Sequence, residues 1–285
     1  MNISTPFLAL GFFLATLIAY AGWKTQALSP SGALGATLIG GFVFGFGGLT
    51  WAVILVAFFL TSSLLSLLGA ASKRNSGVIA KTGPRDFRQT MANGGIALLM
   101  ALAVGFVGHQ SVWYPYLTLA YFGSLAAATA DTWATELGML SSRPPRLIIS
   151  GEIVQPGVSG GVTPLGMLAS LGGGLFLALI AFSAIQAASL LTTGEWFLQD
   201  SFLLLVLPVA GFLASLFDSI LGATLQQLYY CERCEVFTET PIHQCGATAH
   251  PLRGIPWMNN DLVNFLSTCM GALTAILISL PFLAS

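Results

Sequence analysis

The chain consists of long apolar runs separated by short polar loops. A helix needs about 20 consecutive apolar residues to cross a bilayer. By this criterion the sequence predicts a bundle of about eight membrane-spanning helices, at residues 5–22, 31–48, 50–70, 91–109, 116–138, 163–189, 201–224 and 259–283. Only the glycine-rich stretch 45–48 separates the second run from the third, so seven helices are the alternative if no turn forms there.

The composition agrees with this pattern. Hydrophobic residues make up 55% of the chain and charged residues 7%, and the mean hydropathy is +0.82. Soluble domains contain about 25% charged residues, so a large soluble core is excluded. We therefore expect an all-α integral membrane protein that forms a single polytopic domain over residues 1–285. The first run lacks the basic leader and cleavage site of a signal peptide, which predicts that it is retained as a span.

The basic residues predict the orientation in the membrane. With eight spans, every Lys and Arg falls in a loop on one side: Lys24, Lys73, Arg74, Lys81, Arg85, Arg88, Arg143, Arg146, Arg233 and Arg253. The opposite loops carry only Glu195 and Asp200 as charged residues. Because cytoplasmic loops are enriched in Lys and Arg, this predicts a cytoplasmic basic side and non-cytoplasmic termini. Seven spans would move Lys24 to the other side.

Polar side chains concentrate at the predicted cytoplasmic ends of four helices. They are Gln89 and Asn93 in the fourth, Asp131 and Glu136 in the fifth, Asp218 and Gln226 at the end of the seventh, and Asn260, Asp261 and Asn264 in the eighth. An acid at membrane depth is costly unless it faces a partner, a cation or water. Together these residues indicate one shared cytoplasm-facing site. For an isolated acid, a packing pair with a neighbouring helix is the alternative.

The carboxylates of this group predict a metal site. Asp131, Glu136, Asp218 and Asp261 supply hard oxygen ligands, which suit Mg²⁺. Asp131 and Glu136 are five residues apart, about 140° around a helix, so they can flank a cleft. Mg²⁺ held by one or two carboxylates usually completes its shell with substrate phosphates. The alternative is helix capping, above all by the neighbouring Asn259.

Two segments are candidates for phosphate binding. Arg85, Arg88 and Gln89 precede the fourth helix, and Arg binds phosphate with paired hydrogen bonds while a helix start offers free N–H groups. Gly160 and Gly161 lie in a loop that leads into the sixth helix, where small residues let backbone N–H groups approach an anion. Ordinary positive flanking and a simple turn are the alternatives. The glycine-rich loop lacks the Gly-Lys-Ser/Thr of a Walker motif.

Residues 225–257 predict a small cytoplasmic loop with metal-binding potential. A Cys-x-x-Cys pair is followed by further Cys and His residues, and the candidate ligands are Cys231, Cys234, His243, Cys245 and His250. This set is compatible with Zn²⁺, and we expect a structural role because no open ligand position is evident. Reduced thiols in an ordinary loop are the alternative.

Several motifs resemble a known family. The chain resembles the polytopic membrane family that includes the phytyl-phosphate kinase of tocopherol synthesis and the eukaryotic transmembrane protein nineteen. The matching stretches are 31–36, 85–94, 130–138, 156–163, 218–226 and 259–266, in family order over nearly the whole chain. One departure is the pair Val158 and Ser159, where the family pattern is Gly-Thr-Asn-Gly across 156–159.

The resemblance implies a kinase that converts an isoprenyl monophosphate (phytyl, farnesyl or geranylgeranyl) to its diphosphate, with CTP or another nucleoside triphosphate as donor. It further implies that Mg²⁺ and the triphosphate bind to acidic residues and that amide and basic residues bind phosphates. The first set is Asp131, Glu136, Asp218 and Asp261; the second is Arg85, Arg88, Gln89, Asn93, Gly160, Gly161, Gln226, Asn260 and Asn264. Within these sets, Asp131, Glu136, Asp218 and Asn93 are the expected catalytic residues.

Other functions share some of these features. A lipid-phosphate transporter or flippase also uses buried acids and broken helices, but it needs polar groups along a whole path. A transferase that uses a nucleotide-activated alcohol would share the metal and phosphate groups. A non-catalytic scaffold would not need converging acids. The expected partners are the lipid bilayer, the prenyl phosphate and the nucleotide, with no nucleic acid, in a bacterial-type inner (plasma) or thylakoid membrane.

Overall fold

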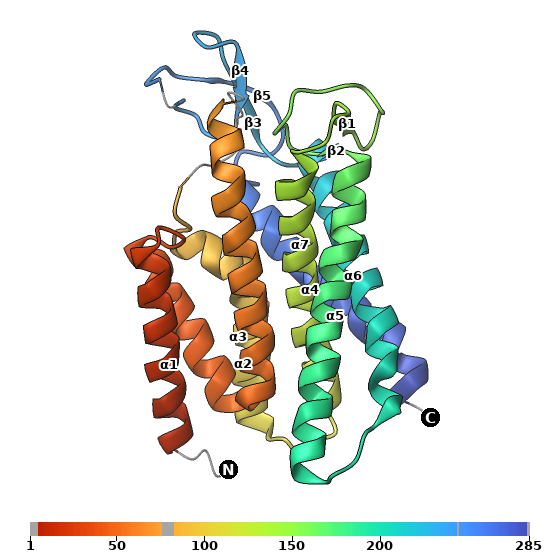
Figure 1. The fold of residues 1–285 in the computed structure, drawn as a ribbon. Helices are drawn as coiled ribbons and strands as arrows, with labels where there is room; N and C mark the ends of the chain where they lie inside the picture. Colours follow the sequence, from red (N-terminus) through yellow and green to blue (C-terminus); the bar gives the residue numbers. More distant parts are fainter. Residues whose placement is uncertain (1–4, 76–82, 244, 284–285) are drawn as a thin grey trace.

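The computed structural model describes residues 5–75, 83–243 and 245–283. Long helices dominate this part of the chain: α1 (Thr5–Lys24), α2 (Pro30–Asn75), α3 (Phe87–Val107), α4 (Tyr114–Gly138), α5 (Pro164–Thr192), α6 (Leu203–Thr224) and α7 (Asn260–Leu283). A short 3₁₀ helix, η1 (Leu198–Phe202), precedes α6. Figure 1 shows the helices side by side in one bundle. Lys81, one of the basic loop residues, lies outside the described residues.

Helix α2 is a hairpin and not one continuous rod. Its 46 residues would extend for about 70 Å if straight, roughly twice the hydrocarbon thickness of a membrane. Gly48 has a backbone φ of 76° and ψ of −167°, which is non-helical and suits glycine. The chain reverses there, and the half before Gly48 and the half after it run in opposite directions (Figure 1). The turn expected within residues 45–48 is therefore present.

The described helices are those of an integral membrane protein. By length and composition, six helices are able to cross a membrane: Pro6–Lys24, Pro30–Gly69, Phe87–Val107, Pro164–Thr192, Leu198–Thr224 and Asn260–Leu283. The first of these presents large apolar side chains such as Phe7, Phe13 and Leu17 to its surroundings, as contact with lipid requires. A count of eight spans adds α4 and separates the two halves of α2, and it stays a prediction.

Helix α4 lies at the centre of the bundle and differs in composition from its neighbours. Residues 119–130 of α4 are buried without interruption, many of them Ala, Gly or Ser. These small residues let α5, α6 and α7 pack closely: a Cβ on Gly211 of α6 would come within 2.9 Å of the Ala126 carbonyl oxygen. Because other helices cover it, α4 needs few of the bulky apolar residues that face lipid. Its buried position brings the acids at its end against several helices.

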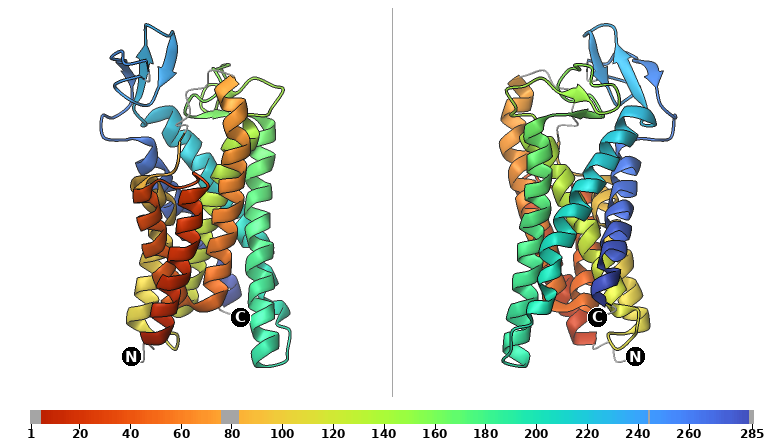
Figure 2. Two further views of the ribbon diagram at one scale, coloured as in Figure 1. Left: turned by 60° about the vertical axis from the view of Figure 1, so that its left-hand side comes forward. Right: turned by 90° about the vertical axis from the view of Figure 1, so that its right-hand side faces the viewer.

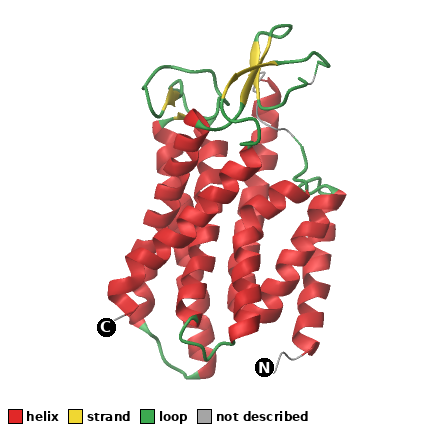
Figure 3. Cartoon of the chain, turned by 180° about the vertical axis from the view of Figure 1, so that it is seen from behind, coloured by secondary structure: helices red, strands yellow, loops and turns green. Residues whose placement is uncertain are grey.

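Short strands occupy one end of the bundle. Strands β3 (Leu228–Cys231), β4 (Val236–Thr238) and β5 (His250–Arg253) form an antiparallel sheet in the order β4-β3-β5. Strand β1 (Arg146–Leu147) pairs with β2 (Gly161–Val162) between α4 and α5. Figures 2 and 3 show both sheets at the same end. The expectation of an all-α protein is therefore wrong for these loops, where aromatic and β-branched residues such as Tyr229, Tyr230 and Val236 favour strands.

The start of α1 and the end of α7 both lie at the end of the bundle opposite to the strands (Figure 1). This is the arrangement that an even number of crossings produces. It places the loop with the cysteines on the side opposite to both terminal helix ends. That the strand end faces the cytoplasm, with non-cytoplasmic termini, stays a prediction from the distribution of basic residues.

Candidate functional site

A cavity of about 520 Å³ opens at the strand end of the bundle. It is bounded by the end of α4, the loop 141–163, the start of α5 and the end of α6, and by single residues of α3 and α7. We call it the polar cavity. Its lining includes most residues that the sequence assigned to the site, namely Gln89, Asp131, Glu136, Gly160, Gly161, Asp218, Gln226 and Asn260. Residues that are far apart in the sequence therefore line the same cavity; Gln89 and Asn260 are 171 positions apart.

Acidic side chains from three elements line the polar cavity. Asp131 comes from α4, Asp218 from α6 and Glu239 from the residue directly after β4. Asp131 and Glu239 lie close enough to Asp218 to interact with its charge. Within the described chain, Oδ2 of Asp218 is buried and has no hydrogen-bond partner. A buried carboxylate oxygen without a donor, beside other carboxylates, fits the oxygen-rich ligand set that Mg²⁺ takes.

Glu136 is tied to Arg85 through a serine. The Arg85 guanidinium (Nη2) donates to Ser66 Oγ at 3.2 Å and to the Ser62 carbonyl oxygen at 3.1 Å, and Ser66 Oγ donates to Glu136 Oε1 at 2.9 Å. Burial lowers the pKa of Arg85, and the charge of Glu136 opposes this effect. Glu136 is only 8% exposed. One oxygen of Glu136 is thus linked through Ser66 to Arg85, in the loop before α3. This link distinguishes Glu136 from Asp131 and Asp218.

Glu239 is held in the polar cavity by the loop before α5 and by the end of α6. Ser159 Oγ donates to Glu239 Oε1 at 2.9 Å, and the buried Gln226 donates to the same oxygen at 2.8 Å and to Ser159 Oγ at 3.0 Å. Arg253 of β5 donates to the carbonyl oxygens of Ser159, at 2.9 Å, and Ala223. The strand sheet, the loop and α6 are therefore locked together at the cavity wall.

The glycines of the loop 155–163 have a packing role. Gly160 has a φ of +85°, and a Cβ there would lie 2.5 Å from the backbone nitrogen of Ala223 in α6. Thr163 caps α5 by accepting a hydrogen bond from the Gly166 N–H at 3.0 Å. The start of α5 lines the polar cavity through Thr163, Gly166 and Met167, and the positive end of its dipole favours an anion there.

Replacing Gly160 by Ala is expected to destabilise the protein by about 3 kcal/mol or more, because strain at positive φ adds to a clash with α6 backbone. Gly151 is a matched control: its φ is +72°, but nothing lies within 4 Å of an added Cβ. Gly151→Ala should cost only about 1 kcal/mol. Thermal unfolding in detergent measures both. Equal losses in the two variants would contradict the close approach of the loop to α6.

A second cavity, of about 80 Å³ and lined mainly by apolar residues, lies between α1, α2 and α3. We call it the apolar cavity. Its walls come from side chains such as Ile18, Ile39 and Phe58, and one end is lined by Arg85, Gln89, Thr90 and Asn93. Gln89 lines both cavities. This residue is thus part of the wall of each cavity.

Gln89 and Asn93 also have local structural roles. Asp86 caps α3: its side chain accepts from the Gln89 N–H at 3.0 Å, and the Gln89 side chain accepts from the Asp86 N–H at 3.1 Å. Asn93 Nδ2 donates to the Gln89 carbonyl oxygen at 3.0 Å. The capping box explains part of the polar sequence before α3 without any ligand. It leaves the Gln89 amide nitrogen at the junction of the cavities.

Three residues assigned to the site do not line either cavity. Arg88 is exposed on the first turn of α3, and Asp261 and Asn264 are half-buried in α7. Asn259 is the helix cap, because its side chain accepts from the Leu262 N–H at 3.0 Å. Of the polar cluster that begins α7, only Asn260 lines the polar cavity.

Two polar-cavity residues were not singled out from the sequence for a role in the site. Glu239 was one acid among several in a polar loop, and its contact partner Ser159 lies 80 positions earlier. Arg143 was read only as a flanking charge, yet among the described residues that line the polar cavity it is the one Lys or Arg. It is exposed, so it offers a cation to an incoming anionic ligand at the cavity mouth.

Comparison with known proteins finds relatives that span most of the chain. The protein PGR of Arabidopsis thaliana is 32% identical over 280 residues, covering 94% of each chain. An uncharacterized membrane protein of Methanocaldococcus jannaschii is 26% identical over 282 residues, covering 98% of each chain. The protein VTE6, chloroplastic, of Arabidopsis thaliana is 25% identical over 255 residues, which cover 88% of this chain and 65% of that protein. No solved structure matches.

A family described as integral membrane protein DUF92 matches residues 13–272. This range contains all the residues that line the two cavities, and it contains the cysteine-rich loop. The match extends over nearly the whole chain and confirms the family assignment made from the motifs. The chain belongs to the DUF92 family of integral membrane proteins.

Proposed function

We propose that the protein is a membrane kinase that transfers a phosphoryl group from a nucleoside triphosphate to an isoprenyl monophosphate. The single observation that carries this proposal is the junction at Gln89. This residue lines both the polar cavity, with its acids and the start of α5, and the apolar cavity between α1, α2 and α3. An amphiphile with an apolar tail and a phosphate head matches the two environments.

In the proposed reaction, an oxygen of the acceptor monophosphate attacks the γ-phosphorus of the nucleoside triphosphate. The bond between that phosphorus and the β–γ bridging oxygen breaks, so the products are the isoprenyl diphosphate and the nucleoside diphosphate. The acceptor is already an anion, so no general base is required. Phosphoryl transfer depends mainly on positioning and on neutralising charge.

Asp131 and Asp218 are the residues proposed to hold Mg²⁺, with Glu239 beside them. The buried, unpartnered oxygen of Asp218 supports this assignment. When bound, Mg²⁺ would offset the negative charge of the phosphates. Arg143 would bind the triphosphate with its guanidinium donors, and the positive end of the α5 dipole would favour its negative charge.

Arg85, Gln89 and Asn93 are proposed to orient the acceptor phosphate at the polar end of the apolar cavity. Glu136 then acts as a positioning residue, because it fixes Arg85 through Ser66. The prenyl tail would extend along Ile39 and Phe58. In this arrangement the acceptor phosphate faces the acids across Gln89.

One observation disfavours a transporter of lipid phosphates. The polar cavity is lined by helix ends on the strand side, whereas an alternating-access path needs polar groups at mid-depth and on the far side. The distribution of basic residues supports a cavity that opens to the cytoplasm, in a plasma or thylakoid membrane.

The experiment is a direct transfer assay. Purified protein in detergent is incubated with Mg²⁺, labelled CTP or ATP, and phytyl, farnesyl or geranylgeranyl monophosphate, and the lipid product is separated and identified. We expect a labelled isoprenyl diphosphate with at least one combination. No diphosphate with any combination would contradict the proposal, and movement of labelled lipid phosphate across liposomes without turnover would favour a flippase.

A further inference from the structure

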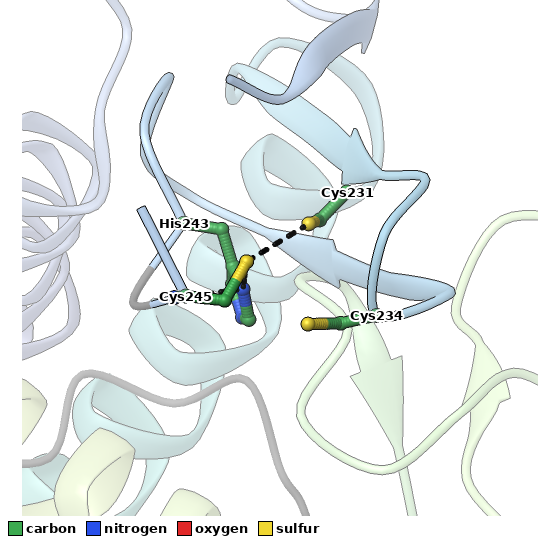
Figure 4. A group of neighbouring side chains, drawn as sticks. All are labelled: Cys231, Cys234, His243 and Cys245. Atoms are coloured by element: carbon green, nitrogen blue, oxygen red, sulfur yellow. Dashed lines mark hydrogen bonds between the residues drawn. The ribbon is translucent and has the colours of Figure 1, made fainter. Parts of the chain in front are cut away.

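Four side chains of the loop between α6 and α7 converge on one point. Cys231, Cys234, His243 and Cys245 each offer a ligand atom, and these atoms all lie within 4.8 Å of one another. Figure 4 shows the three sulfurs and the imidazole directed toward a common centre. The cluster belongs to neither cavity, so the proposed kinase chemistry does not account for it.

The separation of two sulfurs in the cluster matches tetrahedral zinc. Zn–S bonds of about 2.3 Å at tetrahedral angles separate two sulfurs by about 3.8 Å, and a sulfur from a nitrogen by about 3.6 Å. The Cys231 and Cys245 Sγ atoms are 3.7 Å apart, and His243 Nδ1 is 3.2 Å from Cys245 Sγ. A disulfide needs sulfurs at about 2.05 Å, so the pair is spaced for a shared ion and not for a bond.

Each half of the cluster lies on a tight turn. Cys231 ends β3 and pairs in register with Val236 of β4, with Cys234 in the connecting turn. Glu235, directly after Cys234, has a φ of 56°, and Gly246, directly after Cys245, has a φ of 80°. A non-glycine residue at positive φ is uncommon and needs a surrounding constraint. A metal held by the turn supplies such a constraint.

His250 is excluded from the ligand set that the sequence suggested. Its side chain is 64% exposed and its imidazole lies 3.8 Å from the carboxylate of Glu232. It begins β5, and it is not a member of the four-residue cluster. The remaining ligands are three thiolates and one imidazole, a composition of structural zinc sites without an open position.

We propose that Cys231, Cys234, His243 and Cys245 bind one structural zinc ion, and that this ion holds the β3–β4–β5 sheet in the form that places Glu239 in the wall of the polar cavity. The zinc ligands and Glu239 are close along the chain, since Glu239 follows β4 directly and β4 pairs with the end of β3 that carries Cys231. Glu239 then contacts Ser159 and Gln226. Zinc thus fixes the outer wall of the site without taking part in its chemistry.

The zinc content of the purified full chain tests the ligand set independently of any kinase activity. We expect about one zinc ion per chain, lost in His243→Ala and Cys234→Ala and retained in His243→Cys, which offers a fourth thiolate. His250→Ala is the matched control and should keep the ion. A metal-free wild-type protein from zinc-supplied cells, or equal loss in His250→Ala and His243→Ala, would overturn the proposal.

Hydrogen exchange on wild-type protein, before and after zinc removal with a chelator, tests the link to the cavity. Faster exchange is expected in residues 225–257 and also in 155–163, and adding zinc back should reverse both changes. Faster exchange in 225–257 alone would overturn the coupling to the cavity wall. Because Arg253 of β5 donates to the end of α6 and to the loop, the change is expected there, and α1–α3 should be unchanged and serve as the internal control.

Discussion

Asp218→Asn is expected to lower the rate of phosphoryl transfer by about two to three orders of magnitude while the protein becomes no less stable. The amide has the volume of the carboxylate but lacks the charge that holds a cation. In the absence of metal, the substitution also removes repulsion between Asp218 and the nearby Asp131 and Glu239. Loss of function together with an unchanged or raised unfolding temperature is the signature of a functional acid and not of a packing residue.

The measurement combines the transfer assay with thermal unfolding in metal-free detergent. Glu195→Gln is the control, because Glu195 is an exposed acid at the opposite end of the bundle. It should leave both quantities at their wild-type values. A clear fall in the unfolding temperature of Asp218→Asn, with transfer at the wild-type rate, would show that the carboxylate serves folding and would contradict its assignment as a metal ligand.

The helices were predictable because lipid imposes a simple requirement. A spanning helix exposed to lipid must be a long apolar run, and the observed α5, at Pro164–Thr192, lies close to the expected 163–189. The turn at Gly48 was predictable because glycines separate two such runs. The strands were missed because they follow from backbone pairing between segments such as Leu228–Cys231 and His250–Arg253, which hydropathy does not record.

The site was predictable only in part. Asp131 and Asp218 stand out because a charge in an apolar helix needs a reason, and both line the polar cavity. Glu239 lies in a polar loop, where an acid is ordinary, and only the folded contacts with Ser159 and Gln226 reveal its position. Arg88 follows Arg85 at helical spacing, yet it is exposed, because the helix start turns its side chain away from both cavities.

The same difficulty applies to Glu136. From the sequence it is equivalent to Asp131, since both end the same apolar run. In the folded protein Ser66 of α2 donates to Glu136, and that serine lies 70 positions earlier. No local pattern connects a serine in one spanning helix with a glutamate in another. Neighbouring acids can therefore have different tasks, one toward a metal and one toward an arginine, and only tertiary structure separates them.

Arg85→Gln is expected to destabilise the protein by roughly 3 kcal/mol, because it removes a buried cation that interacts with the Glu136 charge and donates to Ser62 and Ser66. Adding Glu136→Gln should restore about 1–3 kcal/mol of this loss, since the double variant removes the buried negative charge together with the cation that interacts with it. The free energy of unfolding of both single variants and the double variant, from denaturant titration in detergent, gives the coupling energy. Arg88→Gln, three residues later on the first turn of α3 and exposed, should change stability by about 0.5 kcal/mol or less.

Transfer activity separates the two tasks of Arg85. If it only neutralises Glu136, the double variant should regain activity together with stability. If it also binds the acceptor phosphate, as proposed from its place at the polar end of the apolar cavity, activity should stay low in the double variant, and the Michaelis constant for the prenyl phosphate should rise more than that for the nucleotide. Full recovery of turnover in the stable double variant would reassign Arg85 to folding and leave Gln89 and Asn93 to orient the acceptor.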